Sequence, residues 1–225
     1  MKDRYVCGAL TAALWAAVVG VAAWWAAGGG PAEMGTWTGW TTSTGRLSGL
    51  LASVLLLAQG FMIARIPLVE KTFGQEGRAG AQRLLGIASV SLMGAHIVLI
   101  AIGYAGGSLV GSLAEFVDLV RTHPAILLAL AGAVAVLAGA ITSAKALRRR
   151  FPDESQHLLQ LYAFLGGGLA LPHQLWTGQE FLDSPLITAM WWAVWGATAF
   201  AVILWRIVIP TWRTMRHGVR GFRLA

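Results

Sequence analysis

The sequence predicts an all-α integral membrane protein, a bundle of six transmembrane helices with the N- and C-termini in the cytoplasm. Three observations predict this fold. Of the 225 residues, 56% are apolar and only 12% are charged, a charged fraction about half that of an ordinary soluble domain. Six apolar segments are long enough to cross a bilayer. The basic residues fall almost entirely on one side of these segments, as the positive-inside rule requires.

The first three spans are predicted at about 5–28, 45–64 and 84–105. Crossing a bilayer takes about 20 apolar residues. The first run exceeds the roughly 7 to 15 residues of a signal-peptide core, so we expect it to be retained as a helix. The second run stops before Arg65 and the third follows Arg83, since charged side chains are costly within the hydrocarbon core.

The last three spans are predicted at about 124–144, 158–176 and 185–206, and the fourth and sixth begin with a proline. The fifth is the shortest and contains three consecutive glycines at 166–168 and Pro172. In water these residues would break a helix, whereas in a membrane bundle they permit close approach of another helix or of a cofactor.

The orientation follows from the positive charges. With the N-terminus in the cytoplasm, only Arg46 and Arg121 of the 17 Lys and Arg residues fall on the outer side. This asymmetry predicts cytoplasmic termini and a multi-pass protein of the plasma or inner membrane. Five acidic residues are expected on the outer side: Glu33, Glu115, Asp118, Glu180 and Asp183.

Composition also excludes several classes of function. The net charge of +7 lies in short loops between apolar runs, not on a soluble basic face, so membrane lipid and not nucleic acid is the expected partner. Cys7 is the only cysteine, which excludes an intrachain disulfide and a thiolate metal cluster. Residues 1–225 read as a single membrane domain. No glycine-rich dinucleotide fingerprint is found, so we expect no cytoplasmic flavin or nicotinamide domain in this chain.

Two histidines stand out within the predicted spans, His96 in the third and His173 in the fifth. Intramembrane ionisable residues are costly and commonly functional. Both spans run outward, and both histidines lie in their outward halves, His96 about 18 Å from the start of its helix. Two histidines on facing helices are the arrangement that a bis-imidazole haem needs. Alternatively, each donates a hydrogen bond to a backbone carbonyl of a neighbouring helix.

Several short stretches together carry a resemblance to a known family. They are GRLSGLL (45–51), ARIP (64–67), FG (73–74), RLLG (83–86) and LPHQLWTG (171–178). Over nearly its whole length the chain resembles the ferric reductase-like transmembrane domain family, which includes NADPH oxidases and ferric reductases. The last stretch is similar to the bacterial haem-binding membrane reductases.

The resemblance implies a haem site and the loss of another. Members of the family hold two stacked haems with two histidines on helix three and two on helix five. The outer pair matches His96 and His173, which would be the axial ligands of the haem iron. Gln82 stands fourteen residues before His96, and Gln160 stands thirteen before His173. Because a glutamine amide is a poor haem ligand compared with imidazole, we expect one haem b, near the outer face.

Other positions leave alternatives open. Arg46, at the entry of the second span, either pairs with a haem propionate or anchors the helix at the membrane interface. Arg121 and His123, on the outer loop before the fourth span, are further candidates for the propionate role or for contact with an electron acceptor. The vacated inner site, Gln82 and Gln160, either hydrogen-bonds a flavin or a quinone or contains only the two amides paired with each other.

The leading hypothesis for function is a membrane b-type cytochrome that carries electrons toward the outer face through one bis-His haem. This would be the electron-transfer part of a ferric reductase-like oxidoreductase, with a cytoplasmic flavoprotein reductase or quinol as electron donor. One alternative is a membrane subunit without redox chemistry whose haem site is degenerate. Another is a quinone- or flavin-linked reductase of an extracytoplasmic partner.

Overall fold

A computed structural model describes residues 2–142 and 153–222, and every regular element in these ranges is helical, so the all-α prediction is confirmed. A 3₁₀ turn, η1, follows the first helix, and a π turn, η2, joins the last two. The elements are α1 (Lys2–Ala27), η1 (Ala32–Gly35), α2 (Trp37–Ile63), α3 (Pro67–Tyr104), α4 (Ser112–Thr122), α5 (Pro124–Thr142), α7 (Asp153–Leu169), α8 (Leu171–Thr177), α9 (Gln179–Leu182), α10 (Pro185–Ile203), η2 (Leu204–Val208) and α11 (Ile209–Phe222).

Five helical segments in the described part of the chain are long and apolar enough to cross a membrane, which shows a multi-pass membrane protein. Less than half of each segment is buried inside the bundle, which a membrane protein tolerates because lipid tails solvate apolar groups as well as a protein core does. The segments are Tyr5–Ala27, Trp37–Ile63, Ala79–Tyr104, Pro124–Thr142 and Pro185–Arg216.

The predicted span at 158–176 is not one helix. It comprises the 17-residue α7 and the seven-residue α8, which are separated at Ala170. Pro172 occupies the first turn of α8. The N–H that proline lacks needs no partner at that position, but proline cannot continue a helix that precedes it. The count of six spans stays a prediction. The end of the span predicted at 124–144 lies outside the described residues.

Two helices begin earlier than their apolar runs. The span predicted at 45–64 belongs to α2, which begins at Trp37 because the hydroxyl of Thr36 accepts a hydrogen bond from the Gly39 backbone N–H, 3.1 Å away. The span predicted at 84–105 belongs to α3, which begins at Pro67 and kinks at Gly74, where φ is 63°. Hydropathy locates the membrane-spanning part of a helix, whereas capping and turn residues decide where the helix starts.

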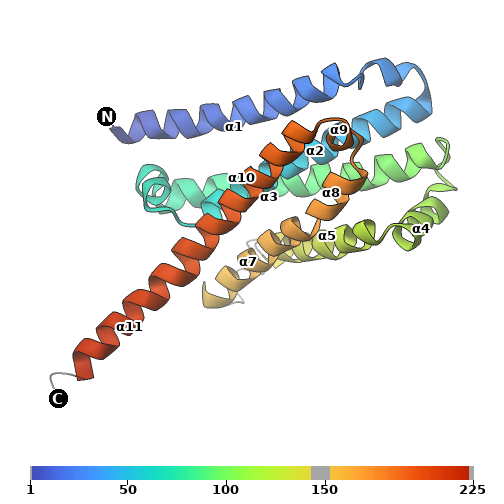
Figure 1. Ribbon diagram of the computed structural model, residues 1–225. Coiled ribbons are helices and arrows are strands. Elements are labelled where there is room, and N and C mark those ends of the chain that lie inside the picture. Colours follow the sequence, from blue (N-terminus) through green and yellow to red (C-terminus); the bar gives the residue numbers. More distant parts are fainter. Residues whose placement is uncertain (1, 143–152, 223–225) are drawn as a thin grey trace.

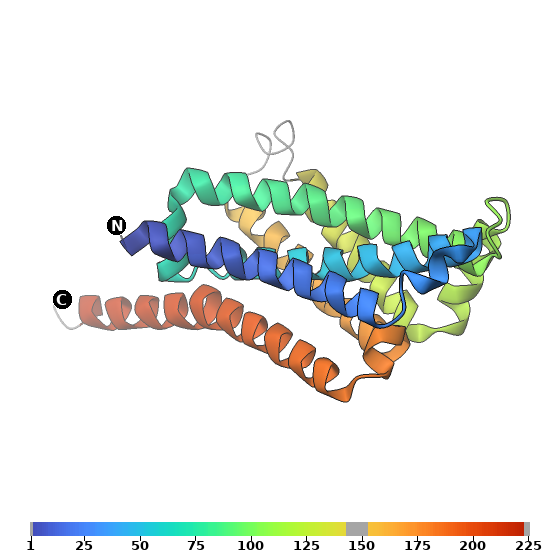
Figure 2. The ribbon, with the colours of Figure 1, turned by 90° about the horizontal axis from the view of Figure 1, so that it is seen from above.

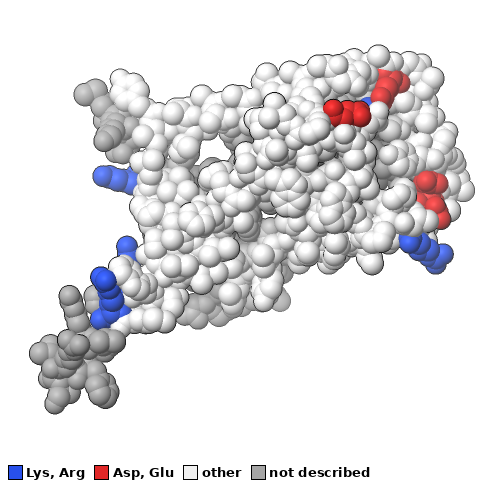
Figure 3. All heavy atoms as spheres, viewed as in Figure 1, with Lys and Arg blue, Asp and Glu red and all other residues white. Residues whose placement is uncertain are grey.

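The long helices lie side by side, with α2 packed along α3 and α5 packed along α7 (Figures 1 and 2). The start of α1 and the end of α11 lie at one end of the bundle, and η1, α4 and α9 lie at the other. In the view of Figure 3, most of the visible Lys and Arg residues lie at the end with the termini. The visible Asp and Glu residues lie at the opposite end, where some basic atoms are also seen. The bundle therefore has a basic end and an acidic end.

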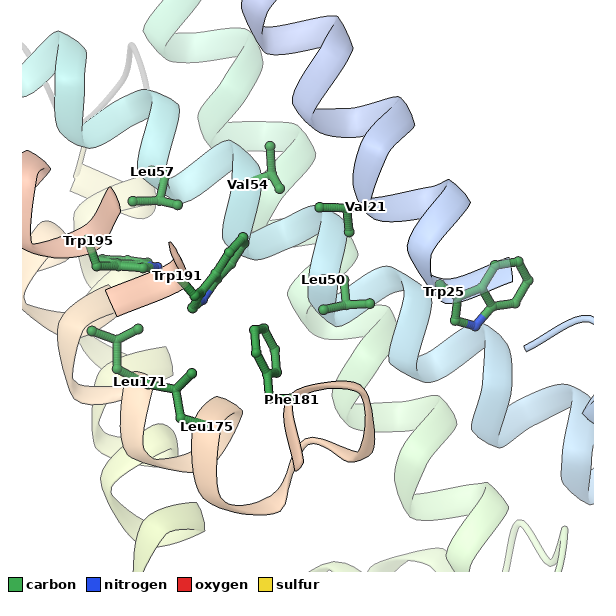
Figure 4. Packing of buried hydrophobic residues seen from close by; sticks show 10 residues of the cluster. All are labelled: Val21, Trp25, Leu50, Val54, Leu57, Leu171, Leu175, Phe181, Trp191 and Trp195. Carbon is green, nitrogen blue, oxygen red and sulfur yellow. The ribbon is translucent and has the colours of Figure 1, made fainter. Parts of the chain in front are cut away.

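A hydrophobic cluster holds α8 and α9 against α1, α2 and α10 (Figure 4). Phe181 lies at its centre, with its ring 5.5 Å from the Trp191 ring and 5.1 Å from the Trp24 ring between centroids. Leu171 and Leu175 of α8 are buried in the same cluster. This packing fixes the position of α8, the short helix that carries His173.

Candidate functional site

The structure brings His96 of α3 and His173 of α8 together. Their ring centroids are 6.1 Å apart, and the ring planes are inclined by 52°. Both side chains line one cavity toward the acidic end of the bundle. Residues that are 77 positions apart in the chain thus face each other across the bundle.

His96 has its tautomer set by a backbone group. Its Nδ1 lies 2.8 Å from the carbonyl oxygen of Gly45 on α2. A carbonyl oxygen can only accept, so Nδ1 carries the hydrogen and donates it, and Nε2 keeps a free lone pair. The hydrogen bond to a neighbouring helix, which was the alternative to ligation, is therefore present. It does not compete with ligation because it uses the other ring nitrogen.

Gly49 makes room for this ring. A Cβ atom at position 49 would lie 2.6 Å from Nδ1 of His96, far inside van der Waals contact. Only glycine fits at this position with the ring of His96 where it is.

His173 is oriented by a side chain of its own helix. Its Nδ1 lies 2.8 Å from Oγ1 of Thr177, and the Thr177 hydroxyl donates to the His173 carbonyl oxygen at 2.6 Å. Because that hydrogen is already directed at the carbonyl, the hydroxyl oxygen accepts from Nδ1–H of His173. Nε2 of His173 is therefore also left with a free lone pair, as in histidines that ligate metals.

Gln174 anchors α8 to two other helices. Its Oε1 accepts hydrogen bonds from Oγ of Ser53 on α2, at 2.9 Å, and from Nε1 of Trp191 on α10, at 3.0 Å. The indole N–H is only a donor, so the amide oxygen must face it. A seven-residue helix has little stability of its own, and these bonds hold the backbone next to His173 in place.

The cavity between the two histidines has a volume of about 490 Å³, within the range of pockets that hold cofactors. Its walls are mostly apolar and come from α2, α3, α5 and α7, including Leu56, Ile97 and Val136. Its polar lining residues include Arg46 and His123. A cavity of this kind suits a large apolar group with a polar edge.

Arg46 lines the cavity but already has acidic partners. Its guanidinium hydrogen-bonds Glu33 and Gln179, and its Nε lies 3.2 Å from a carboxylate oxygen of Glu180. The side chain is largely buried and ties α2 to η1 and α9. The sequence did not predict either acidic partner. It placed Glu33 and Glu180 on the outer side together with Arg46, and this shared side was the only indication of the pairing. Pairing with a propionate stays a prediction.

Of the other predicted residues, His123 reaches the cavity, whereas Arg121, Gln82 and Gln160 do not. His123 lines the cavity and its Nδ1 lies 2.9 Å from Oγ1 of Thr122, whereas Arg121 lies outside the cavity on α4. Gln82 and Gln160 are half-buried and do not line the cavity. Within the ranges 2–142 and 153–222, no hydrogen bond links the two glutamine side chains. Whether a flavin or quinone binds near them stays a prediction.

The ligand set fits one class of metal group. In the described part of the chain, no three His, Cys, Asp or Glu residues are grouped so that they could hold a metal ion. A bare ion such as zinc normally needs three or four protein ligands. Haem iron needs only axial ligands from the protein, since the macrocycle supplies the rest. Two facing histidines with free Nε2 atoms satisfy that requirement.

No protein-family model, curated protein or solved structure matches the chain. The resemblance to ferric reductase-like domains therefore rests on the short motifs alone. The geometry around His96 and His173 is the independent observation that bears on function.

Proposed function

We propose that this protein is a transmembrane b-type cytochrome that binds one haem between His96 and His173 and carries electrons toward its outer face. The distance of 6.1 Å between the two ring centroids carries this proposal. Two imidazole nitrogens that each lie about 2 Å from a metal, on opposite sides of it, separate their ring centres by about 6 Å. The hydrogen bonds at both Nδ1 atoms leave both Nε2 atoms free to ligate.

Each residue of the site has a defined part in this proposal. His96 and His173 would hold the iron, while Gly45 and Thr177 fix their tautomers and raise their basicity. The apolar cavity walls exclude water, which affects the redox potential. Arg46 and His123 are the cavity residues able to pair with haem carboxylates. Bound haem would supply one-electron transfer.

The proposed topology has six crossings, with α7 and α8 together forming the fifth. An even number of crossings returns the chain to the side on which it starts. This agrees with Figure 1, where the start of α1 and the end of α11 lie at the same end of the bundle. The basic end would face the cytoplasm of a cell bounded by this plasma or inner membrane. Electrons would come from a cytoplasmic flavoprotein reductase or from quinol.

The test is the absorption spectrum and haem content of the purified protein. We expect the Soret and α bands of low-spin bis-His haem at about one haem per chain. His96→Ala and His173→Ala should each abolish this spectrum. His123→Ala should leave the band positions unchanged, because that cavity residue is assigned to the haem carboxylates and not to the iron. A colourless protein after expression with ample haem would contradict the proposal and favour a subunit without redox chemistry.

A further inference from the structure

The last helical rod of the protein is longer than a membrane is thick. The apolar segment Pro185–Arg216 contains 32 residues, about 48 Å of helix at 1.5 Å per residue. The hydrocarbon core of a bilayer is about 30 Å thick. A crossing that starts at Pro185 is therefore complete near η2, and α11 lies beyond it, at the basic end of the bundle (Figure 3).

Little of the protein covers α11. Among the described elements, only η2, from which it continues, contacts it appreciably. The ribbon shows α11 extending past the end of the bundle (Figures 1 and 2). The side chains from Pro210 to Arg216 are exposed to the surroundings of the protein.

An apolar stripe runs from the last residue of η2 into α11, beside a basic stripe on α11. Val208, Trp212 and Met215 follow each other by four and three residues, so they share one face, and they are 49%, 53% and 63% exposed. Arg213 and Arg216 are exposed on the adjacent face. The guanidinium carbon of Arg216 lies 3.7 Å from the centroid of the Trp212 ring, which places a positive charge at the border between the two stripes.

The charge pattern discriminates between possible occupants of this face. The sequence contains no Asp or Glu after Asp183. A second copy packed along the apolar stripe would bring arginine against arginine with no acidic residue of this segment to compensate, which opposes pairing. A surface that presents negative charge above an apolar layer complements both stripes at once.

We propose that α11 is a binding site for anionic phospholipid, with Arg213 and Arg216 on the headgroup phosphates and the apolar stripe at the boundary with the acyl chains. Tryptophan is favoured at this level of a membrane because its ring is apolar and its N–H is polar. Basic residues near an anionic membrane surface add to binding. This site is independent of haem binding.

The full chain carrying Cys7→Ser and Met215→Cys, labelled at position 215 with an environment-sensitive fluorophore, tests the proposal in single-copy nanodiscs. We expect a blue-shifted emission and protection from iodide in discs with phosphatidylglycerol, but not in discs of phosphatidylcholine alone. The double variant Arg213→Gln and Arg216→Gln should reduce the ratio of membrane-protected to iodide-accessible label about 25-fold, since each arginine strengthens membrane binding about fivefold. Arg121→Gln, at the opposite end, is the matched control and should change nothing.

Equal emission and equal quenching in neutral and anionic discs would overturn the proposal. So would energy transfer between labels in two-copy discs that is the same in both lipids, because it would show a second copy on the stripe. Protection that appears only when an acidic soluble protein is added would identify a protein partner instead and would overturn it as well.

Discussion

At the scale of single residues, the ring of His96 packs directly against Gly49, so this contact is sensitive to an added side chain. Gly49→Ala places a methyl group 2.6 Å from Nδ1, so the ring must move and we expect haem content to fall several-fold. Gly94→Ala on α3, where a Cβ meets nothing within 4 Å, should keep full haem content. If both variants bind haem equally, the ring of His96 does not occupy the ligand position.

Thr177 is expected to tune the electron affinity of the site. Its hydroxyl oxygen accepts from Nδ1–H of His173, which makes Nε2 more basic and favours ferric iron. Thr177→Val removes this acceptor, so the midpoint potential should rise. One neutral hydrogen bond is worth about 1 kcal/mol, which corresponds to a few tens of millivolts for one electron. Redox titration measures the shift. Thr177→Ser keeps the hydroxyl, and a rise of the same size in that variant would contradict the assigned bond.

At the scale of elements, the crossing of α5 and α7 depends on backbone contact between two glycines. A Cβ at Gly132 would lie 2.2 Å from the carbonyl oxygen of Gly166, and a Cβ at Gly166 would lie 2.6 Å from that of Gly132. Glycine allows such close approach in membrane bundles. Gly132→Ala must separate the helices, and overpacking of this kind costs about 1 to 3 kcal/mol.

Thermal unfolding in detergent checks this crossing, with Gly168→Ala as control because a Cβ there meets nothing within 4 Å. We expect a lower Tm for Gly132→Ala and an unchanged or slightly higher Tm for the control, since alanine favours helix over glycine. A lower Tm in both variants alike would show that backbone propensity, and not the crossing, is what matters.

At the scale of the whole molecule, the proposed topology places the ends of the bundle on opposite sides of the membrane. In a Cys7→Ser background, Thr214→Cys on α11 should react with an impermeant maleimide only from the cytoplasmic side. Ala114→Cys on α4, at the other end of the bundle, should react only from outside. Reaction of both cysteines from one side would contradict the six-crossing arrangement.

The sequence by itself determined the helical class, the apolar segments and the charge asymmetry between the two ends. These properties depend on composition and on order along the chain, which the bilayer selects directly. It also singled out His96 and His173, because few polar groups occur within the spans and helical rise converts position into depth.

Only the tertiary structure decided which faces of the helices meet. The depth of a residue along a helix does not tell which way its side chain points around the helix axis. Residue spacing therefore could not predict the contact between His96 and Gly49, the hydrogen bonds of Gln174 or the acidic partners of Arg46. In the sequence, the break between α7 and α8 is marked only by glycines and a proline. Because a membrane helix can tolerate these residues, they did not predict a break. Packing against α2 and α10 settles where the broken helix lies, and with it the position of His173.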